Sequence, residues 1–440
     1  MTRIVLHLAL FLLLPISALF GQEFGIKFSG FVKSDLFYDS RQTVNIREGH
    51  FLLYPAGHNP DAEKADLNSQ GSFNFLSIQT RLSGTISAPD AFSAKTSGVL
   101  EADFFGNENA NFVDANGFRL RHAYAKLTWP STELLIGQFW HPFFVPACFS
   151  EVISFNTGAP MQPFSRNPQV RLLRKLGSFR LIAAAVSQRD FTSGGGSAPL
   201  RNSAVPDLNA QLHFTRTTAD GKKEFLIGAG ASYKTLLPQL QTTKKVDSVS
   251  VLLYETNETV SGLSTMAFMK YKTPSISFKI QGVYGENLFD LTMLGGYAVS
   301  AVVDPAKNTV KYTTVNSYSV WSECIFQKGT KVQYALWAGY TENLGSRDTI
   351  IAFSNRVGGS DVTVRGASAD NSSDIKRIFR ISPRIVVVSG SLTFALETEY
   401  TNAAFARKNG AILYRDVYGK ITRTENVANW RLLLSTILKF

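Results

Sequence analysis

The sequence predicts an all-β protein: a closed, transmembrane antiparallel β-barrel of about sixteen strands. Three observations lead to this prediction. Polar and apolar residues alternate along most of the chain, as in strands with one polar and one apolar face. Short turns and long polar loops alternate between these segments. The composition is 12% aromatic but only 18% charged, against about 25% charged in an ordinary soluble domain.

The composition excludes several other classes of protein. A chain that is 44% hydrophobic is too apolar for disorder. Two cysteines cannot build a disulfide framework, and the histidines have no zinc-site spacing with a cysteine partner. Past the N-terminal segment, nothing approaches the ~18 apolar residues of a transmembrane helix. The formal charge is +11, but no basic-aromatic RNA-binding motif accompanies it. We expect no metal, no cofactor and no nucleic-acid partner.

The N-terminus is typical of a secretion signal. Arg3 precedes an apolar run from Ile4 to Phe20, and Gly21 is a small residue at the expected cleavage point. We therefore expect residues 1–21 to be a signal peptide and residues 22–440 to be one barrel domain. The first strand starts a few residues later, so no plug domain is expected to fill the barrel.

The alternation is clearest in two segments. In residues 276–284, one face carries Ile276, Phe278, Ile280 and Tyr284, and the other carries Ser277, Lys279 and Gln281. In residues 26–38, Ile26, Phe28, Val32 and Tyr38 oppose Lys27, Lys33 and Asp35. Soluble antiparallel sheets alternate as well, but their connections do not sort into short and long classes. A closed barrel also pairs every backbone group without leaving an edge.

The connections set the number of strands. Short links are expected at 88–91, 130–133, 176–178, 219–222, 273–275, 327–329 and 389–390. Long loops are expected at about 41–72, 106–117, 142–167, 190–207, 237–257, 287–311, 344–374 and 405–427. These connections join sixteen strands, with short turns on the periplasmic side and long loops on the extracellular side.

The last strand gives an independent signal. Trp430 and Phe440 share its apolar face with Leu432, Leu434 and Leu438. A chain that ends in an aromatic residue on an amphipathic strand resembles bacterial outer-membrane proteins. In that class, the barrel-assembly machinery reads the terminal strand, which implies an assembly role for Trp430 and Phe440.

Three further segments carry a resemblance to a narrower family. Residues 118–125, 137–143 and 167–174 resemble the DcaP-like and phosphate-selective porins, and the end of the signal resembles secreted proteins of Bacteroidetes. The resemblance implies a homotrimeric passive diffusion channel in the outer membrane that is not an enzyme. It also implies a preference for small anionic solutes such as phosphate or dicarboxylates.

Basic residues on the polar strand faces are the candidates for pore lining. A positive lumen favours anions, and the arginine fork binds carboxylate or phosphate in a bidentate manner. The candidates are Arg81, Lys95, Arg119, Arg121, Arg171, Arg380, Arg384 and Arg431. Replacing Arg380 and Arg384 together with Ser is expected to shift the reversal potential toward cations.

Strand parity raises three difficulties. If Arg119 and Arg121 both face the lumen, strict alternation turns His122 toward lipid. A bulge near His122 would remove this conflict. Arg171 and Arg174 differ by three positions, so one lies at a rim or beyond a bulge. Pro383 cannot donate to a strand ladder, which predicts a bulge or a membrane-rim position there.

The third long loop, 142–167, is the expected constriction. It is rich in Phe and Pro, and its only charges are Glu151 and Arg166. Such an apolar loop should pack against protein, and in the resembled porins it folds into the lumen. Phe149, Glu151 and Arg166 are its candidate constriction residues. Packing at a trimer interface or over the rim is the alternative.

Two other functions remain open. An adhesin or structural barrel would bind partners through loops 41–72 and 344–374. A barrel hydrolase would need an outward His122 or His213 near a serine, but no G-x-S-x-G motif is present. We expect the basic charge to serve anionic solutes, outer-membrane lipid and the phosphates of lipopolysaccharide.

Overall fold

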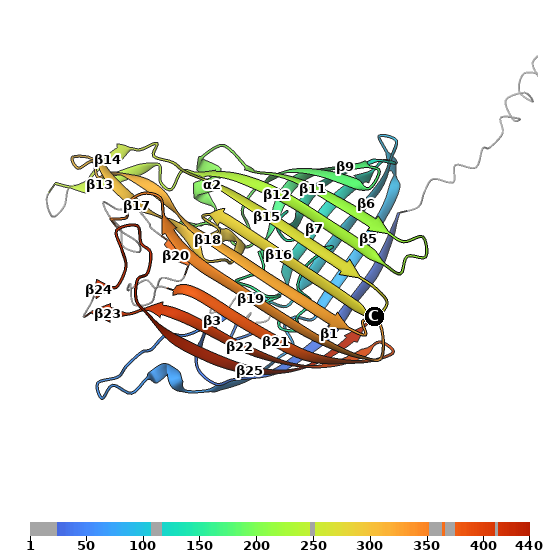
Figure 1. Ribbon diagram of the computed structural model, residues 1–440. Coiled ribbons are helices and arrows are strands. Elements are labelled where there is room, and N and C mark those ends of the chain that lie inside the picture. The colour runs from blue at the N-terminus through green and yellow to red at the C-terminus, as the bar shows by residue number, and fades with distance from the viewer. Residues whose placement is uncertain (1–23, 107–116, 247–250, 352–362, 366–374, 410–411) are drawn as a thin grey trace, which may run out of the picture.

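The computed structural model describes residues 24–106, 117–246, 251–351, 363–365, 375–409 and 412–440. The expected signal peptide, 1–21, lies outside the described residues. The described chain forms a closed antiparallel barrel of sixteen tilted strands (Figure 1). The predicted fold class is confirmed.

The barrel wall uses most of the strand residues. Its strands are β1 (Gly25–Asp39), β5 (Arg81–Ala91), β6 (Ala94–Asp103), β7 (Arg119–Thr128), β8 (Thr132–Trp140), β9 (Arg166–Leu176), β10 (Phe179–Val186), β11 (Asp207–Thr217), β12 (Glu224–Leu236), β15 (Val260–Lys272), β16 (Ile276–Glu286), β18 (Thr309–Phe326), β19 (Val332–Ser346), β21 (Ile375–Ser389), β22 (Leu392–Ala406) and β25 (Thr424–Lys439). The wall closes because β1 pairs with β5 and, from Phe31↔Lys439 to Asp39↔Arg431, with β25.

Shorter elements lie in the connections. They are β2 (Thr43–Ile46), β3 (Phe51–Pro55), η2 (Leu67–Ser69), β4 (Ser72–Leu76), α2 (Ala198–Asn202), β13 (Gln241–Lys245), β14 (Val251–Glu255), η3 (Phe289–Leu291), β17 (Gly295–Asp304), β20 (Thr363–Arg365), β23 (Lys408–Asn409) and β24 (Ile412–Leu413). β4 extends the wall beside β1, and β17 pairs with β18 and β20. No helix in the described ranges has the length and apolarity to cross a membrane.

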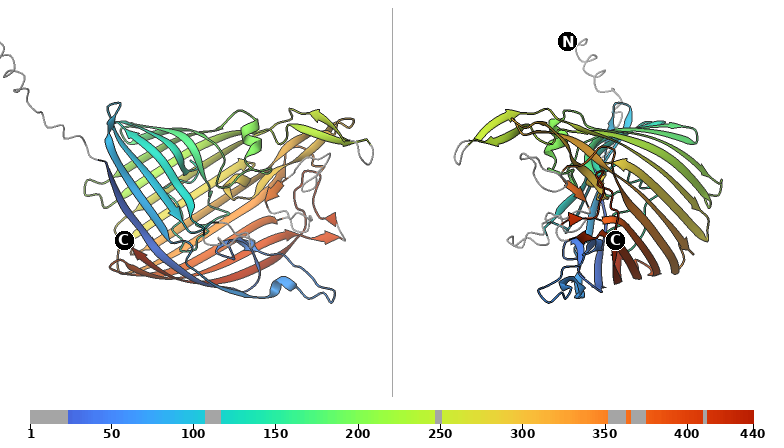
Figure 2. Two further views of the ribbon diagram at one scale, coloured as in Figure 1. Left: turned by 180° about the vertical axis from the view of Figure 1, so that it is seen from behind. Right: turned by 60° about the vertical axis from the view of Figure 1, so that its left-hand side comes forward.

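The longer connections gather at one end of the barrel, and the C-terminus lies near the other (Figures 1 and 2). One predicted turn is wrong. Residues 88–91 belong to β5, and the chain reverses at Phe92 and Ser93, which adopt φ of 52° and 58°. A register shift between Ala88 and Ala91 lets the strand continue past Pro89.

The two faces of the wall differ in polarity. Apolar side chains point outward and stay exposed, including Phe28, Leu100, Val170, Leu212 and Leu432. Trp430 and Phe440 are 55% and 61% exposed on this outer surface. The alternating positions carry buried polar groups that face the interior. This is the arrangement that a barrel needs in lipid, where apolar residues face outward.

The predicted bulge near His122 is present. Glu101 pairs with His122, but the next residue, Ala102, pairs with Leu120, so Arg121 is the extra residue of β7. The bulge changes the parity of the strand. Arg121 and His122 are consequently both buried on the inner side.

The predicted bulge or rim position at Pro383 is wrong. Pro383 lies inside β21 opposite Leu336, with an exposed outward ring. The β21–β22 ladder skips Ser382 and Pro383, but it resumes in the same register at Arg384. The strand therefore tolerates the missing N–H by losing local pairing, without the extra residue of a bulge.

Candidate functional site

The connection between β8 and β9 lies inside the barrel. We call residues 141–165 the inner loop, because β9 already begins at Arg166. Wall side chains donate to its carbonyl oxygens: Lys33 to Ile153 (2.6 Å), Gln211 to Pro142 (2.8 Å), Lys279 to Phe149 (2.8 Å), Gln281 to Phe143 (2.8 Å), Ser319 to Met161 (2.9 Å) and Arg380 to Ala159 (2.8 Å). Buried backbone groups need such partners, so the wall holds the loop in place.

Two wall carboxylates anchor the loop amides. Glu397 accepts hydrogen bonds from the Ile153 and Ser154 N–H groups at 2.8 and 3.2 Å. Glu323 accepts from the Glu151 N–H at 3.0 Å. A carboxylate that accepts backbone N–H groups makes charge-assisted bonds. The inner loop, which connects β8 and β9, is thus bonded to β18 and β22, two strands that follow much later in the sequence.

The side chain of Glu151 adds an ionic anchor. It pairs with Lys279 of β16 and with Lys328 in the turn before β19. Burial raises the pKa of Glu151, but the two lysines outweigh burial and lower the pKa to about 2. Glu151 therefore stays ionised at neutral pH. The nearby Phe149 ring lies 5.5 Å from Lys279 Nζ.

A second connection also folds inward, which the sequence did not predict. The β2–β3 hairpin places Phe51 at 0% exposure, and its ring packs edge-on against Phe155 and Phe164 of the inner loop. Arg380 donates to Leu53 O at 2.7 Å, and Arg431 donates to Gly49 O at 2.6 Å. Part of loop 41–72, which the adhesin alternative would use to bind partners, is therefore buried in the barrel.

These connections build a hydrophobic core inside the barrel. Phe143, Phe144, Phe155 and Phe164 of the inner loop pack in one cluster with wall residues such as Trp337. Cys148 of the loop is buried there as a free thiol, and burial raises its pKa to about 12. The interior is thus more filled than the open aqueous channel that sixteen strands predict.

One part of the inner wall is covered by the inner loop and the hairpin. We call it the covered wall; its charged residues are Lys33, Asp35, Asp39, Lys279, Glu323, Arg380, Arg384, Glu397, Glu399 and Arg431. Each is at most 5% exposed. The closest pairs are Arg431–Asp39 at 2.6 Å and Arg384–Glu323 at 2.7 Å. Five cations face five anions, as buried charges require partners.

A further charged part of the inner wall is only partly covered, although its Asp103, Arg121 and Arg166 are at most 2% exposed. We call it the open wall; its charged residues are Arg81, Glu101, Asp103, Arg119, Arg121 and Arg166. Arg121 bonds both Glu101 and Asp103, at 2.8 and 2.9 Å. The Arg81 and Arg119 side chains keep 21% exposure. Here the arginines outnumber the carboxylates, although Asp190 also approaches Arg166 and Arg119.

A cavity of about 340 Å³ separates the open wall from the inner loop. Its lining includes Arg81, Arg121 and Trp140 of the wall strands and Phe149 and Phe155 of the inner loop. The Arg81 Nε atom and the Ser150 and Ser154 hydroxyls are buried without a hydrogen-bond partner within the described part of the chain, and Arg81 Nε lies 3.6 Å from the Glu101 carboxylate. The cavity therefore has two arginine side chains in its lining, beside aromatic rings.

The structure distributes the predicted site residues between these regions. Arg81, Arg119 and Arg121 lie on the open wall, and Arg380, Arg384 and Arg431 on the covered wall. Arg171 faces inward with its guanidinium over Phe139, while Arg174 is exposed on the outer side and bonds Thr132. Lys95 is exposed beside the turn that follows β5. Arg166 is 1% exposed and lies over the rings of Trp140 and Phe164.

The structure does not place outward either histidine that the hydrolase alternative would need. His122 is buried on the inner side, with its ring 5.2 Å from Phe139 and its Nε2 3.9 Å from Glu101. His213 faces inward as well, against Gln211 and Phe268. The bulge explains His122, since it shifts the parity of β7 by one residue. Neither position therefore offers a histidine on the outer wall.

Comparisons with known proteins identify the fold. DcaP, an outer membrane channel of Acinetobacter baumannii, matches with a TM-score of 0.64 and 18% identity over 95% of this chain and 97% of that one. An anion-selective porin of Comamonas acidovorans matches with 0.53 and 9% identity over 95% and 100%. OmpT of Vibrio cholerae matches with 0.50 and 10% identity over 95% and 98%. No protein-family model matches the sequence, and neither does any curated protein.

The chain has the fold of the bacterial outer-membrane porins. The structure of DcaP is among those that it resembles, so the resemblance expected from residues 118–125, 137–143 and 167–174 holds at the level of the fold. A closed barrel of this type with an apolar outer wall belongs in the bacterial outer membrane, as predicted.

Proposed function

We propose that the protein is a passive diffusion channel for small anionic solutes. The observation that carries the proposal is the cavity between the open wall and the inner loop. Arg81 and Arg121 border it, and the Arg81 side chain keeps 21% exposure. A solute that crosses the barrel beside the inner loop meets this positive surface.

The physical basis is electrostatic. Charges on the wall of a narrow passage with low-dielectric surroundings concentrate solutes of the opposite sign. Trp140 supports the guanidinium groups, since Arg166 and Arg121 lie 5.0 and 5.8 Å from its ring centre. The planar guanidinium fork presents N–H groups whose spacing suits carboxylate and phosphate oxygens. Phosphate and small dicarboxylates are the solutes that we propose, and the anion-selective porin of Comamonas acidovorans is a precedent for anion selectivity on this fold.

The inner loop sets the width of the passage in this proposal. Phe149 and Glu151 lie on its cavity side, and Arg166 holds its end through Asp190 at 2.7 Å. The covered wall contributes anchoring, since its charges are paired and buried. The protein acts as a channel and not as an enzyme, in keeping with the inward positions of His122 and His213.

Reversal potentials in a planar bilayer test the proposal. Under a tenfold KCl gradient, the wild type should prefer chloride, and Arg81→Ser with Arg121→Ser should move the reversal potential toward the cation value. The matched control replaces Lys222 and Lys223, two exposed cations in the turn before β12, with Ser. An unchanged reversal potential in the Arg81/Arg121 variant, or an equal shift in the control, would contradict the role of the open wall.

Assembly is part of the same proposal. We propose export through residues 1–21, recognition of Trp430 and Phe440 by the barrel-assembly machinery, and a homotrimer seated in outer-membrane lipid and lipopolysaccharide. The outward exposure of both aromatic residues supports their accessibility to that machinery. An unheated gel should show a trimer band that collapses on boiling. Deletion of Phe440 should lower the amount of barrel recovered from outer membranes.

A further inference from the structure

Arg166 of the open wall takes its partner from a connection. Within the described residues, it forms its ion pair with Asp190, which lies between β10 and β11. The Asp190 Oδ2 atom accepts from Arg166 Nε at 2.8 Å and lies 2.7 Å from Nη2. The other arginines of the open wall pair with Glu101 and Asp103, which both belong to strand β6. Asp190 therefore differs from these two carboxylates, because no strand ladder holds it.

Asp190 reaches a second arginine as well. Its Oδ1 atom lies 3.9 Å from Arg119 Nη1. Arg119 and Arg166 are the first residues of β7 and β9, at the end of the wall where the long connections gather (Figure 1). One carboxylate oxygen thus faces each guanidinium group. A carboxylate or phosphate from solution would place its oxygens in the same way between two arginines.

The Asp190 side chain covers Arg166. The Arg166 side chain is 1% exposed, whereas Asp190 and Arg119 keep 11% and 21% exposure. Arg166 lies 5.0 Å from the ring centre of Trp140, which also lines the cavity, and its Nη1 atom is buried without a hydrogen-bond partner in the described chain. A buried guanidinium needs a counter-charge. Asp190 supplies it here, and a solute anion in the same position would supply it too.

The backbone that carries Asp190 is held separately from its side chain. The Asn167 Oδ1 atom accepts from the Arg189 N–H at 2.7 Å and from the Asp190 N–H at 3.4 Å. Side chains move between staggered rotamers about the Cα–Cβ bond. A change of the Asp190 rotamer can therefore release Arg166 and Arg119 while the connection stays in place.

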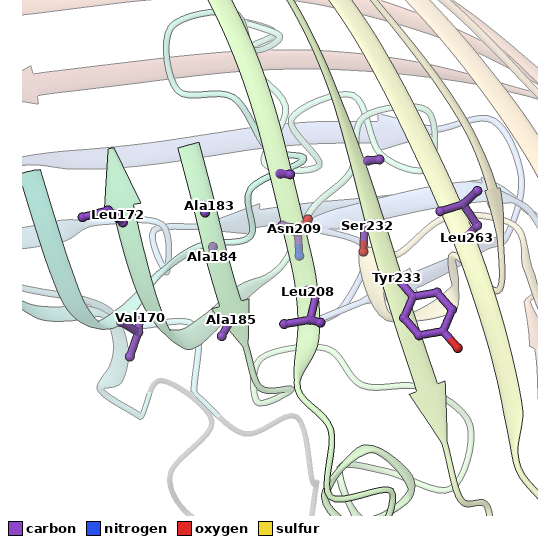
Figure 3. A pocket seen from close by; sticks show the side chains of 12 residues that line it. Val170, Leu172, Ala183, Ala184, Ala185, Leu208, Asn209, Ser232, Tyr233 and Leu263 are labelled. Carbon is purple, nitrogen blue, oxygen red and sulfur yellow. The ribbon is translucent and has the colours of Figure 1, made fainter. Parts of the chain in front are cut away.

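The opposite side of these strands offers no such site. Figure 3 shows the outward side of β9 to β12, where a hollow of about 500 Å³ is lined by residues that include Val170, Leu172 and Ala183. The described lining carries no charged side chain. The outer hollow therefore offers no counter-charge to an anion, whereas the inner side of β9 offers Arg166.

We propose that Arg166 and Arg119 form an anion subsite and that Asp190 is its built-in competitor. The inference rests on the proposed anion channel, since the subsite adjoins the cavity of that channel. Without solute, Asp190 neutralises the subsite. An entering phosphate or carboxylate displaces the Asp190 side chain and binds both guanidinium groups through its oxygens. The return of Asp190 releases it, and conduction requires binding that is weak enough for the solute to leave.

The test measures how inorganic phosphate reduces the chloride current through the full-length protein in a planar bilayer. Asp190→Asn removes the competing charge, so the phosphate concentration that halves the current should fall at least about fivefold, since the released contact is charge-assisted. Asp190→Glu keeps the charge and should stay close to the wild type. The matched control is Asp304→Asn, which removes a carboxylate that is 36% exposed at the end of β17. It should leave the half-blocking concentration unchanged.

A double variant separates competition from a structural role. Arg166→Gln removes the subsite, so adding Asp190→Asn to it should not change the phosphate block further. Equal half-blocking concentrations in the wild type and Asp190→Asn would overturn the proposal. An equal fall in the Asp304→Asn control, or in the Arg166→Gln background, would overturn it as well.

Failure of the proposed function would be seen separately. A wild type without chloride preference would contradict the anion channel. The competition would then be tested by the unfolding temperature of the barrel in detergent, which inorganic phosphate should raise more in Asp190→Asn than in the wild type. An equal rise in both proteins would overturn the role of Asp190.

Discussion

The covered wall and the open wall both carry inward arginines and carboxylates, yet they differ in how far their arginines are enclosed. Arg380 and Arg431 are fully enclosed and bond the inner loop and the β2–β3 hairpin. Arg81 and Arg119 keep part of their surface exposed. The difference arises from the loops, which lie against one side of the interior. An inward arginine is thus a structural anchor on one side and a candidate selectivity residue on the other.

The largest expected effect concerns the covered wall. Arg431→Leu leaves Asp39 without its bidentate partner, whose contacts are 2.9 and 2.6 Å. Removing one member of a buried ion pair costs about 3–5 kcal/mol. Urea unfolding in lipid vesicles should show a loss of this size. A loss near zero would mean that Asp39 finds another partner and that the pair does not hold the hairpin.

The next prediction compares the two walls by selectivity. The sequence alone predicts a cation shift for Arg380→Ser with Arg384→Ser. Burial under the inner loop instead predicts a smaller shift in reversal potential than that of the Arg81/Arg121 variant, with a larger loss of thermal stability. Both variants remove two positive charges, so they are matched. A larger selectivity change in the Arg380/Arg384 variant would place the solute path along the covered wall.

The anchor at Glu151 predicts a pH dependence. A carboxylate whose pKa falls on folding stabilises the folded loop above its ordinary pKa of 4.5, and this contribution is lost as the pH falls toward about 2. Single-channel currents should therefore be steady at neutral pH and become noisy between pH 4.5 and 2.

Glu151→Gln provides the control for this pH dependence. The variant should be noisy at neutral pH and should show no further change on acidification. A wild-type transition above pH 5, or an unchanged transition in the variant, would point to another group.

The smallest expected effect lies outside both walls. Arg174 is exposed on the outer side, and its guanidinium bonds only Thr132 within the described residues. Arg174→Leu should change the unfolding free energy by no more than about 0.5 kcal/mol, the usual range for such surface positions. The reversal potential should not change. A shift in the reversal potential would show that charge on the outer surface of the barrel near Arg174, and not the open wall, controls solute entry.

Several features followed from local sequence. Period-two alternation assigned Lys33, Lys279 and Arg431 to the inner face and Phe28, Leu432 and Trp430 to the outer face, because a strand has only two sides. Parity also located the bulge in β7, since Arg119 and Arg121 could not both face inward beside a lipid-facing His122. The missing N–H of Pro383 was visible too. The sequence did not show whether β21 would accommodate Pro383 with a bulge or with a gap in the hydrogen-bond ladder.

The chain by itself therefore determined the barrel and the inward arginines, because both depend on neighbours along one strand. Tertiary structure decided which arginines stay available. Arg380 is enclosed by Ala159 and Leu53, which are more than 200 residues away in the chain. No local pattern encodes how loops of that separation pack inside a barrel. Their hydrogen bonds to the wall exist only after closure brings distant strands together.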